Sequence, residues 1–348
     1  MAATGEMNEN LVERKNTEKF KDTGDYGELC KIVKKVVKES SHWELYGRDQ
    51  CIVATAFLLL LPMGFLLVRQ QGVLFLLGLF LLGTTHMLAV SKAAHAASHN
   101  ALCATRRWND VFGVFFGEIC GAFSFMAGRE SHVNIHHPHT NVVGLGDSSL
   151  WKAPFLGRKV YLFIAPYFLP FVSPLFSMKM QWGKWRHVAV NFLLMAFGFV
   201  GHFACFKIIS GLTTAWSLIC LLVTRSMFYC PYIHVNIFQH IGLSMYHPEH
   251  RPKRLRLMAT GVLNLSRNSF LDYCFGHSLI NCHVEHHLFP TLSDNMCLKV
   301  KPIVRSYLEK NKLPYHEDSY WNRLKVFYHN YASLMVHAPP LTNFIGIQ

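Results

Sequence analysis

The sequence predicts an all-α fold for an integral membrane protein, with four transmembrane helices and a site for two metal ions. Hydrophobic residues make up 51% of the 348-residue chain, and the longest apolar runs form two pairs. Three groups of histidines at helical spacing lie beside these runs. Lysine and arginine exceed aspartate and glutamate by 13, and most of them lie outside the short links within each pair.

Four apolar runs cover residues 51–68, 72–90, 188–208 and 212–233. A hydrocarbon core of about 30 Å takes about 20 helical residues to cross, and a helix satisfies its own backbone hydrogen bonds there. Each run is therefore expected to be a transmembrane helix. Single polar side chains within these runs, such as His86 and His202, are expected to be packed in the core or bonded to a carbonyl oxygen.

Two further apolar segments are expected to lie on the membrane surface or to dip into it. Residues 160–178 contain Pro166, Pro170 and Pro174, and three prolines this close together break a straight helix. Residues 111–127 contain Glu118 and several small residues. Neither segment is expected to cross the bilayer.

Three histidine clusters accompany the spans. The first cluster has two members, and the second and third have three each: His95 and His99; His132, His136 and His137; His283, His286 and His287. Residues three or four apart share one face of an α-helix. Each cluster is therefore expected to aim its imidazoles at a common point. Neutral imidazole is a ligand for iron, copper, nickel and zinc.

Eight imidazoles are too many for one ion. An octahedral ion binds at most six ligands and must leave room for a substrate, so we expect two metals. His240, at the end of the last span, is a ninth candidate ligand, and Asn236 on the same face could bind through a water. His234 is the competing candidate on another face. The ligand types alone leave both zinc and a redox-active metal open.

The distribution of charge predicts the orientation in the membrane. Links of a few residues join the spans within each pair, and the lysines and arginines gather elsewhere, for example at Arg251, Lys253, Arg254 and Arg256. The positive-inside rule then places both termini and all three clusters in the cytosol. Residues 1–48 are expected to form a cytosolic segment with an amphipathic helix near 29–37, and residues 301–348 a cytosolic tail.

The net charge of +13 has two readings. It is consistent with contact to anionic lipid headgroups, and it would also attract an acidic electron-carrier protein. No nucleic-acid partner is expected. The ten cysteines include no C-x-x-C pair, which argues against a disulfide framework or a zinc ribbon.

The clusters resemble the histidine boxes of the membrane fatty acid desaturases, which run H-x3-H, H-x3-H-H and H-x2-H-H. The matching strings are HAASH, HVNIHHPHTN and HVEHHLFP. The order of spans and clusters also matches, over about residues 45–300. The resemblance implies a desaturase domain at about 49–300, in which four transmembrane helices lie under a cytosolic helical cap. It also implies a multi-pass protein of the endoplasmic reticulum.

The resemblance further implies a chemistry. Enzymes of this family insert a double bond into an acyl chain with two iron ions, O2 and two electrons from cytochrome b5 and its reductase. The eight clustered histidines would be the catalytic iron ligands, with His240 as a ninth and Asn236 acting through a water. In the front-end branch of this family, the third cluster opens with glutamine and a fused cytochrome b5 domain carries an HPGG motif. This chain has His283 at that position and no HPGG motif. A separate electron donor is therefore expected.

Three alternatives stay open at this point. A membrane di-iron hydroxylase would use near-identical clusters and leave an oxygen on the carbon. A membrane zinc hydrolase would hold redox-inert zinc at the same histidines. A non-catalytic lipid-binding homologue would keep the clusters because a bound metal stabilises the fold.

Overall fold

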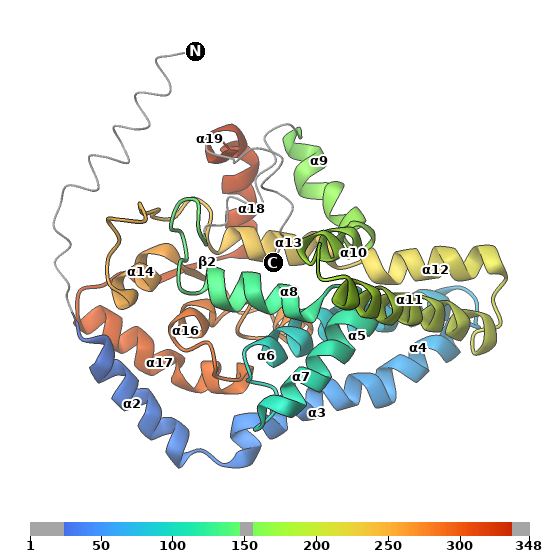
Figure 1. Ribbon diagram of the computed structural model, residues 1–348, viewed down its shortest axis with the longest axis horizontal. Coiled ribbons are helices and arrows are strands. Elements are labelled where there is room, and N and C mark those ends of the chain that lie inside the picture. Colours follow the sequence, from blue (N-terminus) through green and yellow to red (C-terminus); the bar gives the residue numbers. More distant parts are fainter. Residues whose placement is uncertain (1–23, 147–155, 336–348) are drawn as a thin grey trace.

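The computed structural model describes residues 24–146 and 156–335. Helices dominate it, and they divide into two regions (Figure 1). Long apolar helices extend toward one end of the molecule, while shorter helices from the first and last parts of the chain gather at the other. Four helices of the described chain are long and apolar enough to cross a membrane, as the sequence predicts.

The first two spans form a tight hairpin. The first, Trp43–Leu67, joins η1 (Trp43–Gly47), α3 (Arg48–Thr55), η2 (Ala56–Leu60) and α4 (Leu61–Leu67). The second, Val73–Ser98, joins α5 (Val73–Met87), η3 (Leu88–Ala93) and α6 (Ala94–Ser98). Gly72 turns the chain between them with φ +63°. A Cβ at Gly78 would lie 2.7 Å from the Val68 backbone nitrogen, so only glycine permits this close approach of the two helices.

The second pair of spans consists of α11 (Trp185–Ile208) and the continuous helix Thr214–Phe238, which joins α12 (Thr214–Ser226) and α13 (Tyr229–Phe238). The second and fourth spans run beyond their expected ends at residues 90 and 233. These extensions carry His95 and Asn236 in the same rigid helices that cross the membrane. The second and fourth spans are also more buried within the protein than the first and third.

The segment at 111–127 lies within a sharply bent pair of helices. One helix joins α7 (Arg106–Val114) and η4 (Phe115–Cys120), and the other joins α8 (Phe125–Arg129) and η5 (Glu130–His136). The two meet at 112° across a short break. Such a bend fits a segment that dips into the membrane, and the pair would add a fifth span only if it crossed as a unit.

The proline-rich segment differs in part from expectation. Pro166 lies in the first turn of the short helix η7 (Ala165–Phe168), and Pro170 lies in the first turn of α10 (Leu169–Met180). A first helical turn tolerates proline because its N–H groups have no partner within the helix. The chain does break near Ile164, after α9 (Arg158–Phe163). Pro174, however, lies inside α10 and does not end it, contrary to the prediction.

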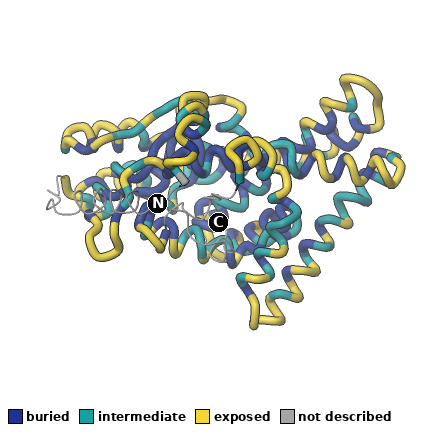
Figure 2. Tube along the Cα trace, turned by 90° about the horizontal axis from the view of Figure 1, so that it is seen from above, coloured by how far each residue is buried: buried dark blue, intermediate teal, exposed yellow. Residues whose placement is uncertain are grey.

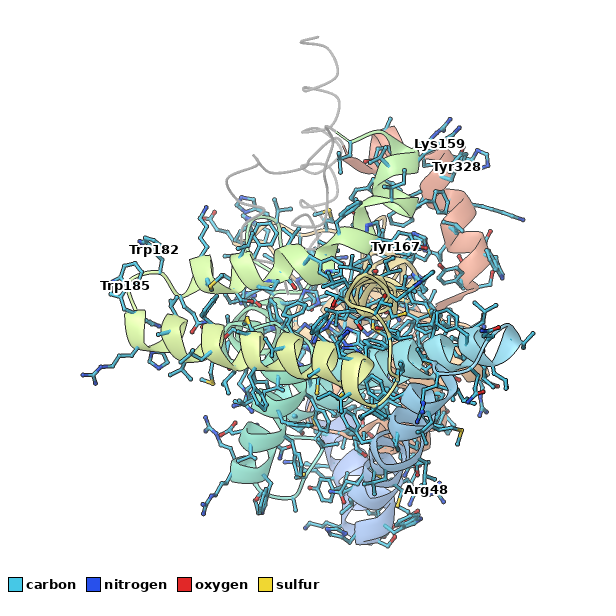
Figure 3. All side chains as sticks on the ribbon, turned by 90° about the vertical axis from the view of Figure 1, so that its right-hand side faces the viewer. Arg48, Lys159, Tyr167, Trp182, Trp185 and Tyr328 are labelled. Carbon is cyan, nitrogen blue, oxygen red and sulfur yellow. The ribbon has the colours of Figure 1, made fainter. Side chains whose placement is uncertain are left out.

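A pair of tryptophans marks the turn between α10 and α11. Trp182 and Trp185 are both exposed, and their ring centroids are 4.6 Å apart. Figure 3 shows them at the tip of this turn, away from the body of the protein. Tryptophan favours the interface between headgroups and hydrocarbon, so this tip is suited to lie there.

The remaining elements form a compact layer around the histidines. The amphipathic helix expected near residues 29–37 is α2, and its Leu29 and Val33 are buried against α17. Two short parallel strands join residues far apart in the chain, with Leu263 opposite His316. Buried positions concentrate in this layer (Figure 2). Its elements are α2 (Tyr26–Glu39), α14 (Arg254–Gly261), β1 (Leu263–Leu265), α15 (Ser269–Phe275), α16 (His283–Leu288), α17 (Asp294–Lys310), β2 (His316–Asp318), α18 (Tyr320–His329) and α19 (Tyr331–Met335).

A buried ionic triad joins this layer to the spans. Lys92 of the second span places its Nζ 2.6 Å from Asp294 Oδ2 and 3.3 Å from Asp49 Oδ1. The backbone N–H of Ser278 donates to Asp294 Oδ1 at 2.9 Å. Burial alone would raise the pKa of Asp294, but the Lys92 ammonium outweighs it and lowers that pKa to about 2. The triad therefore fixes the first two spans against the start of α17.

Replacing Lys92 with methionine should destabilise the protein strongly. The change would leave Asp49 and Asp294 buried without their cation, and breaking a buried ion pair from one side costs about 3–5 kcal/mol. The melting temperature of the purified protein in detergent would report the loss. Lys35→Met is the matched control, because Lys35 pairs with Glu39 on the exposed face of α2 and such pairs contribute little. Equal melting temperatures for the two variants would contradict the role of the triad.

Candidate metal centre

The first histidine cluster lies on one face of a helix, as its spacing predicts. His95 lies in α6 and His99 directly follows it. Their ring centroids are 4.8 Å apart. His99 is buried at 2% exposure, whereas His95 is partly exposed. Both imidazoles therefore contribute to one centre, with His95 at its open side.

The second cluster does not follow α-helical spacing. It lies in η5, where the helix is wound as a π-helix and the His137 N–H donates to the His132 carbonyl five residues earlier. A π-turn brings residues five apart onto one face, and such turns are frequent at functional sites. His132 and His137 consequently point together, with their Nε2 atoms 3.3 Å apart. His136 points elsewhere, so the expectation of one common target for this cluster is wrong.

The third cluster is divided in the same way. His283 and His287 lie four apart in α16, with ring centroids 4.5 Å apart. His286 lies instead against the first cluster, 4.5 Å from the ring of His99. Adjacent residues on a helix point about 100° apart, because one turn takes 3.6 residues. The second and third clusters each contain two adjacent histidines. Each of these adjacent pairs therefore supplies one imidazole to each of two centres.

Two metal-sized groups result. In the first group, five histidines each offer one ring nitrogen, and these nitrogens all lie within 4.8 Å of one another. We call it the five-histidine group. Three imidazoles of the other also meet that limit, and His283 joins them with its Nε2 2.8 Å from His240 Nε2. We call this the four-histidine group. The five-histidine group is His95, His99, His132, His137 and His286, and the four-histidine group is His136, His240, His283 and His287.

The structure distinguishes the two candidates for a ninth imidazole. His234 turns away from both groups, with Nδ1 2.6 Å from the Tyr320 hydroxyl and Nε2 2.7 Å from the Leu162 carbonyl oxygen. His240 lies within the four-histidine group. Asn236 is outside both groups, and its Nδ2 donates to the Tyr232 carbonyl at 2.7 Å. Asn236 nevertheless lines the same cavity as His95 and His132, as a water-mediated role requires.

The tautomers at the four-histidine group favour a cation between the rings. His283 Nδ1 lies 2.8 Å from the Ser278 carbonyl oxygen, and His240 Nδ1 lies 3.4 Å from that of Gly261. A carbonyl oxygen only accepts hydrogen bonds, so each Nδ1 carries the proton. Two Nε2 lone pairs then face each other at 2.8 Å. Because two acceptors repel at this distance, a bound cation would make the arrangement favourable.

The distances and unpaired atoms also fit metal ions. Two nitrogens bound about 2.1 Å from one ion at a right angle lie about 3.0 Å apart, and His95 Nε2 lies 2.9 Å from His132 Nε2. Within the described residues, several buried ring nitrogens have no hydrogen-bond partner, which is costly unless a ligand satisfies them. Those in the two groups are both nitrogens of His99, both of His286, Nδ1 of His137 and Nε2 of His287.

Burial keeps the imidazoles in the form that binds metals. It lowers the pKa of His283 to about 3. It also lowers the pKa values of His137, His240, His286 and His287 well below their ordinary value, and neighbouring imidazoles add to this effect. Neutral imidazole offers a lone pair to a metal, whereas imidazolium does not. The electrostatic environment therefore suits metal ligands rather than proton-carrying histidines.

Several groups that orient the histidines could not be recognised from the sequence. The Thr140 hydroxyl donates to the His136 carbonyl at 2.9 Å and so accepts from His287 Nδ1, 3.0 Å away. The Gly146 carbonyl accepts from His136 Nδ1 at 2.8 Å. Such second partners fix the ring and its tautomer. The only sequence signal was proximity, since Thr140 and Gly146 follow the second cluster closely.

Glu285 lies within the third cluster but faces away from both groups. Its carboxylate accepts from the Tyr315 hydroxyl at 2.8 Å and from Asn264 Nδ2 at 3.0 Å. Asn264 Oδ1 also accepts from the Val284 N–H at 2.8 Å. Burial raises the pKa of Glu285 to about 7. These bonds fix α16 against β1 and so hold the third cluster in place.

An apolar cavity of about 130 Å³ reaches the five-histidine group. His95 and His132 form part of its wall, and its other polar lining residues are Ser98, Arg129, Ser173, Tyr229, Tyr232 and Asn236. The rest of the lining is mainly apolar, including Val90, Phe123, Phe125, Leu169, Phe176 and Ile233. The four-histidine group contributes no residue to this lining. A hydrocarbon chain could therefore lie beside the first group, while the second stays enclosed.

The chain belongs to the fatty acid desaturase family, whose model matches more than half of it. The fatty acid desaturase family model matches residues 71–319, which include all three clusters. The protein is accordingly an oxidoreductase, a multi-pass membrane protein and an enzyme of fatty acyl lipids.

Among its relatives, the chain is similar to fatty acid desaturase 6 of Mus musculus, with 47% identity over 92% of this chain and 94% of that protein. Fatty acid desaturase 6 of Homo sapiens is 45% identical over 92% and 90%. A more distant relative is the Delta(5) fatty acid desaturase fat-4 of Caenorhabditis elegans, with 27% identity over 72% and 62%.

His286→Ala should lower the metal bound per chain, because it removes an imidazole from the five-histidine group and leaves its neighbours without a shared ion. Elemental analysis of the purified protein would measure this, with about two metals per chain expected before substitution and about one after it. His250→Ala is the control. His250 lies with His247 and Glu249 in an exposed group that could also hold an ion. Metal loss confined to His250→Ala would contradict the assignment.

Proposed function

We propose that the protein is a di-iron fatty acyl desaturase that inserts a double bond into an acyl chain, using O2 and two electrons from an external carrier. The convergence of nine imidazoles into two groups beside an apolar cavity is the single observation that carries this proposal. We assign the catalytic domain to about residues 49–300 and the membrane to the endoplasmic reticulum, with the termini and histidines in the cytosol.

Each group would hold one iron. The five-histidine group would bind the iron nearer the substrate, because His95 and His132 line the cavity. The four-histidine group would bind the second iron, which is enclosed by buried side chains. Asn236 would act on the first centre through a water. When bound, the irons would supply the O2 activation that removes hydrogen from an unactivated carbon.

The protein's own residues position the chain and exclude water. The phenylalanines of the cavity, such as Phe123, Phe125 and Phe176, offer an apolar surface to a hydrocarbon. A chain held there would pass His95 and His132. The reaction removes one hydrogen atom from each of two neighbouring carbons of the acyl chain. One O2, two electrons and two further protons then give two waters.

The paired, all-nitrogen site, the cavity beside it and the names of the relatives together favour this function over the alternatives. A hydroxylase would share the site but leave an oxygen atom on the product. A zinc hydrolase would hold a redox-inert metal, whereas the relatives of this chain are named desaturases. A lipid-binding homologue without activity would need no cavity at the metal centre, but one reaches it here.

Expression of the protein in cells with a known fatty acid profile should yield a new acyl species lighter by two hydrogens. His136→Ala should abolish this product, because His136 is a buried member of the four-histidine group. His247→Ala, in the exposed loop, should leave it unchanged. Mass spectrometry of total lipids gives the measurement. A product heavier by one oxygen would indicate a hydroxylase, and full activity of His136→Ala would refute the assignment.

We also propose that the electron donor is an acidic carrier protein, probed most directly with cytochrome b5 and its reductase. Arg251 and Lys253 are exposed in the segment before α14, and Arg251 Nη1 donates to Nδ1 of His139, which lies two residues after the second cluster, at 2.6 Å. Arg254 is different in kind, because it donates to the His287 carbonyl at 2.6 Å and so supports the site itself. Positive charge at this surface would speed encounter with an acidic partner.

Lys253→Glu should raise the KM for the reduced carrier about fivefold and leave kcat nearly unchanged, because the charge acts on encounter rather than on chemistry. The wild-type rate at low carrier concentration should also fall as salt is raised. Lys35→Glu on the exposed face of α2 is the control. Steady-state kinetics with purified carrier measure both effects. If the KM for the carrier changed neither with salt nor with the charge at Lys253, docking at this surface would be contradicted.

A further inference from the structure

A second cavity, separate from the metal centre, lies among the membrane spans. Its volume is about 240 Å³, far above the 10–15 Å³ or so that a single water needs. All four spans contribute to it, together with η4, and these helices lie side by side in Figure 1. The two cavities share no lining residue. We call the second one the intramembrane cavity.

Three nitrogen-bearing side chains from three different spans line this apolar space. They are His86 of α5, His202 of α11 and Arg225 of α12. Among the described residues, Nε2 of each histidine and both Nε and Nη1 of Arg225 are buried without a hydrogen-bond partner. The core packing expected of these histidines is confirmed, because His86 stacks with Tyr229 and His202 with Phe206, but neither Nε2 has a carbonyl partner. The fold collects three unsatisfied polar groups at one place.

Arg225 makes the arrangement costly without an anion. Its guanidinium is always protonated, and it is only 2% exposed. Eleven residues, roughly 17 Å of helix, separate it from Thr214 at the start of the span. That distance places it near the middle of a hydrocarbon core of about 30 Å. A charge at this depth is expensive and is usually functional, with a partner to be found.

The described surroundings of Arg225 supply no such anion. The ring of Phe199 stacks on the guanidinium at 4.0 Å, which covers one face and leaves the N–H edges available. The lining of the intramembrane cavity contains no aspartate or glutamate among the described residues. It is instead formed by hydrocarbon side chains such as Phe57, Leu61, Phe65, Phe115 and Phe197. An occupant therefore needs an anionic group and a hydrocarbon chain.

We propose that the intramembrane cavity binds a fatty acid, with its carboxylate on Arg225 and its chain along the apolar wall. His86 and His202 would donate further hydrogen bonds to the carboxylate or to its hydrogen-bonded water. Arginine suits this role because its planar donors match a carboxylate. The site lies apart from the metal centre, so it goes beyond the proposed desaturation and does not depend on it.

Gly201 provides a way to fill the cavity without touching its charge. It lines the intramembrane cavity, and a Cβ built there would meet nothing within 4 Å. A leucine at this position would enter the open space. Gly198, one turn earlier, is unsuitable because a Cβ there would overlap the Ile119 carbonyl. Gly201→Leu therefore tests occupancy, while Arg225→Met tests recognition of the anion.

The experiment uses an 18-carbon fatty acid with a photoreactive diazirine at mid-chain, and its methyl ester as the neutral match. The full-length protein in lipid nanodiscs is illuminated with each probe, and labelled peptides are identified by mass spectrometry. In the wild type, the acid should label residues 197–205 at least tenfold more than the ester does. Arg225→Met should reduce labelling by the acid to the level of the ester. Gly201→Leu should reduce labelling by both probes.

Two comparisons keep the result interpretable. His136→Ala should label residues 197–205 like the wild type, so loss of desaturation and loss of this site are separable. Arg225→Met should fold, since an apolar residue of similar size often replaces a buried charge without loss of stability. If the Arg225→Met variant does not elute as a folded protein, the labelling of the Gly201→Leu variant alone decides the test. Equal labelling by acid and ester in the wild type would overturn the proposal. So would unchanged labelling in Gly201→Leu, or labelling confined to the metal-centre cavity.

Discussion

Repulsion between imidazole lone pairs is the constraint around which this protein is organised. Carbonyl groups fix Nδ1 of His240 and His283 as donors, so their Nε2 atoms face each other at 2.8 Å as acceptors. Nine buried or half-buried imidazoles meet in two such groups. Only cations between them turn these contacts from unfavourable to favourable. Metal ions bound as proposed would therefore stabilise the fold as well as supply the chemistry.

The membrane spans serve this centre by acting as long, rigid supports. The second span carries His95 on its last turns, and the fourth ends just before His240. The buried Lys92 joins these supports to Asp294 at the start of α17, and Asn264 fixes the third cluster against β1. Polar contacts at the membrane boundary thus transmit the position of the spans to the ligands. Under the proposed function, a centre held in this way would place the ion of the five-histidine group beside a hydrocarbon chain.

The same spans enclose a second polar feature that the metal chemistry does not use. Among the described residues, Nε and Nη1 of Arg225 and Nε2 of both His86 and His202 lie buried in this cavity without a hydrogen-bond partner. One protein of fatty acyl lipids would then hold two cavities of different chemistry. One is apolar and ends at imidazoles, and the other is apolar and ends at a guanidinium. Recognition of an acid by the second would let the enzyme bind free fatty acid in the bilayer.

The sequence by itself determined the four spans, the all-α class and the eight clustered histidines, because hydrophobic length and helical spacing are local properties. It also pointed to His240 beside His234 without choosing between them. Only the tertiary structure decided which histidines share an ion. The π-helical winding of η5 pairs His132 with His137 and separates His136, whereas α-helical spacing suggested a single target. The same holds for Thr140, which accepts from the distant His287, and for Arg225, which shares its cavity with His86 and His202 of other spans. These surroundings depend on packing rather than on neighbouring residues.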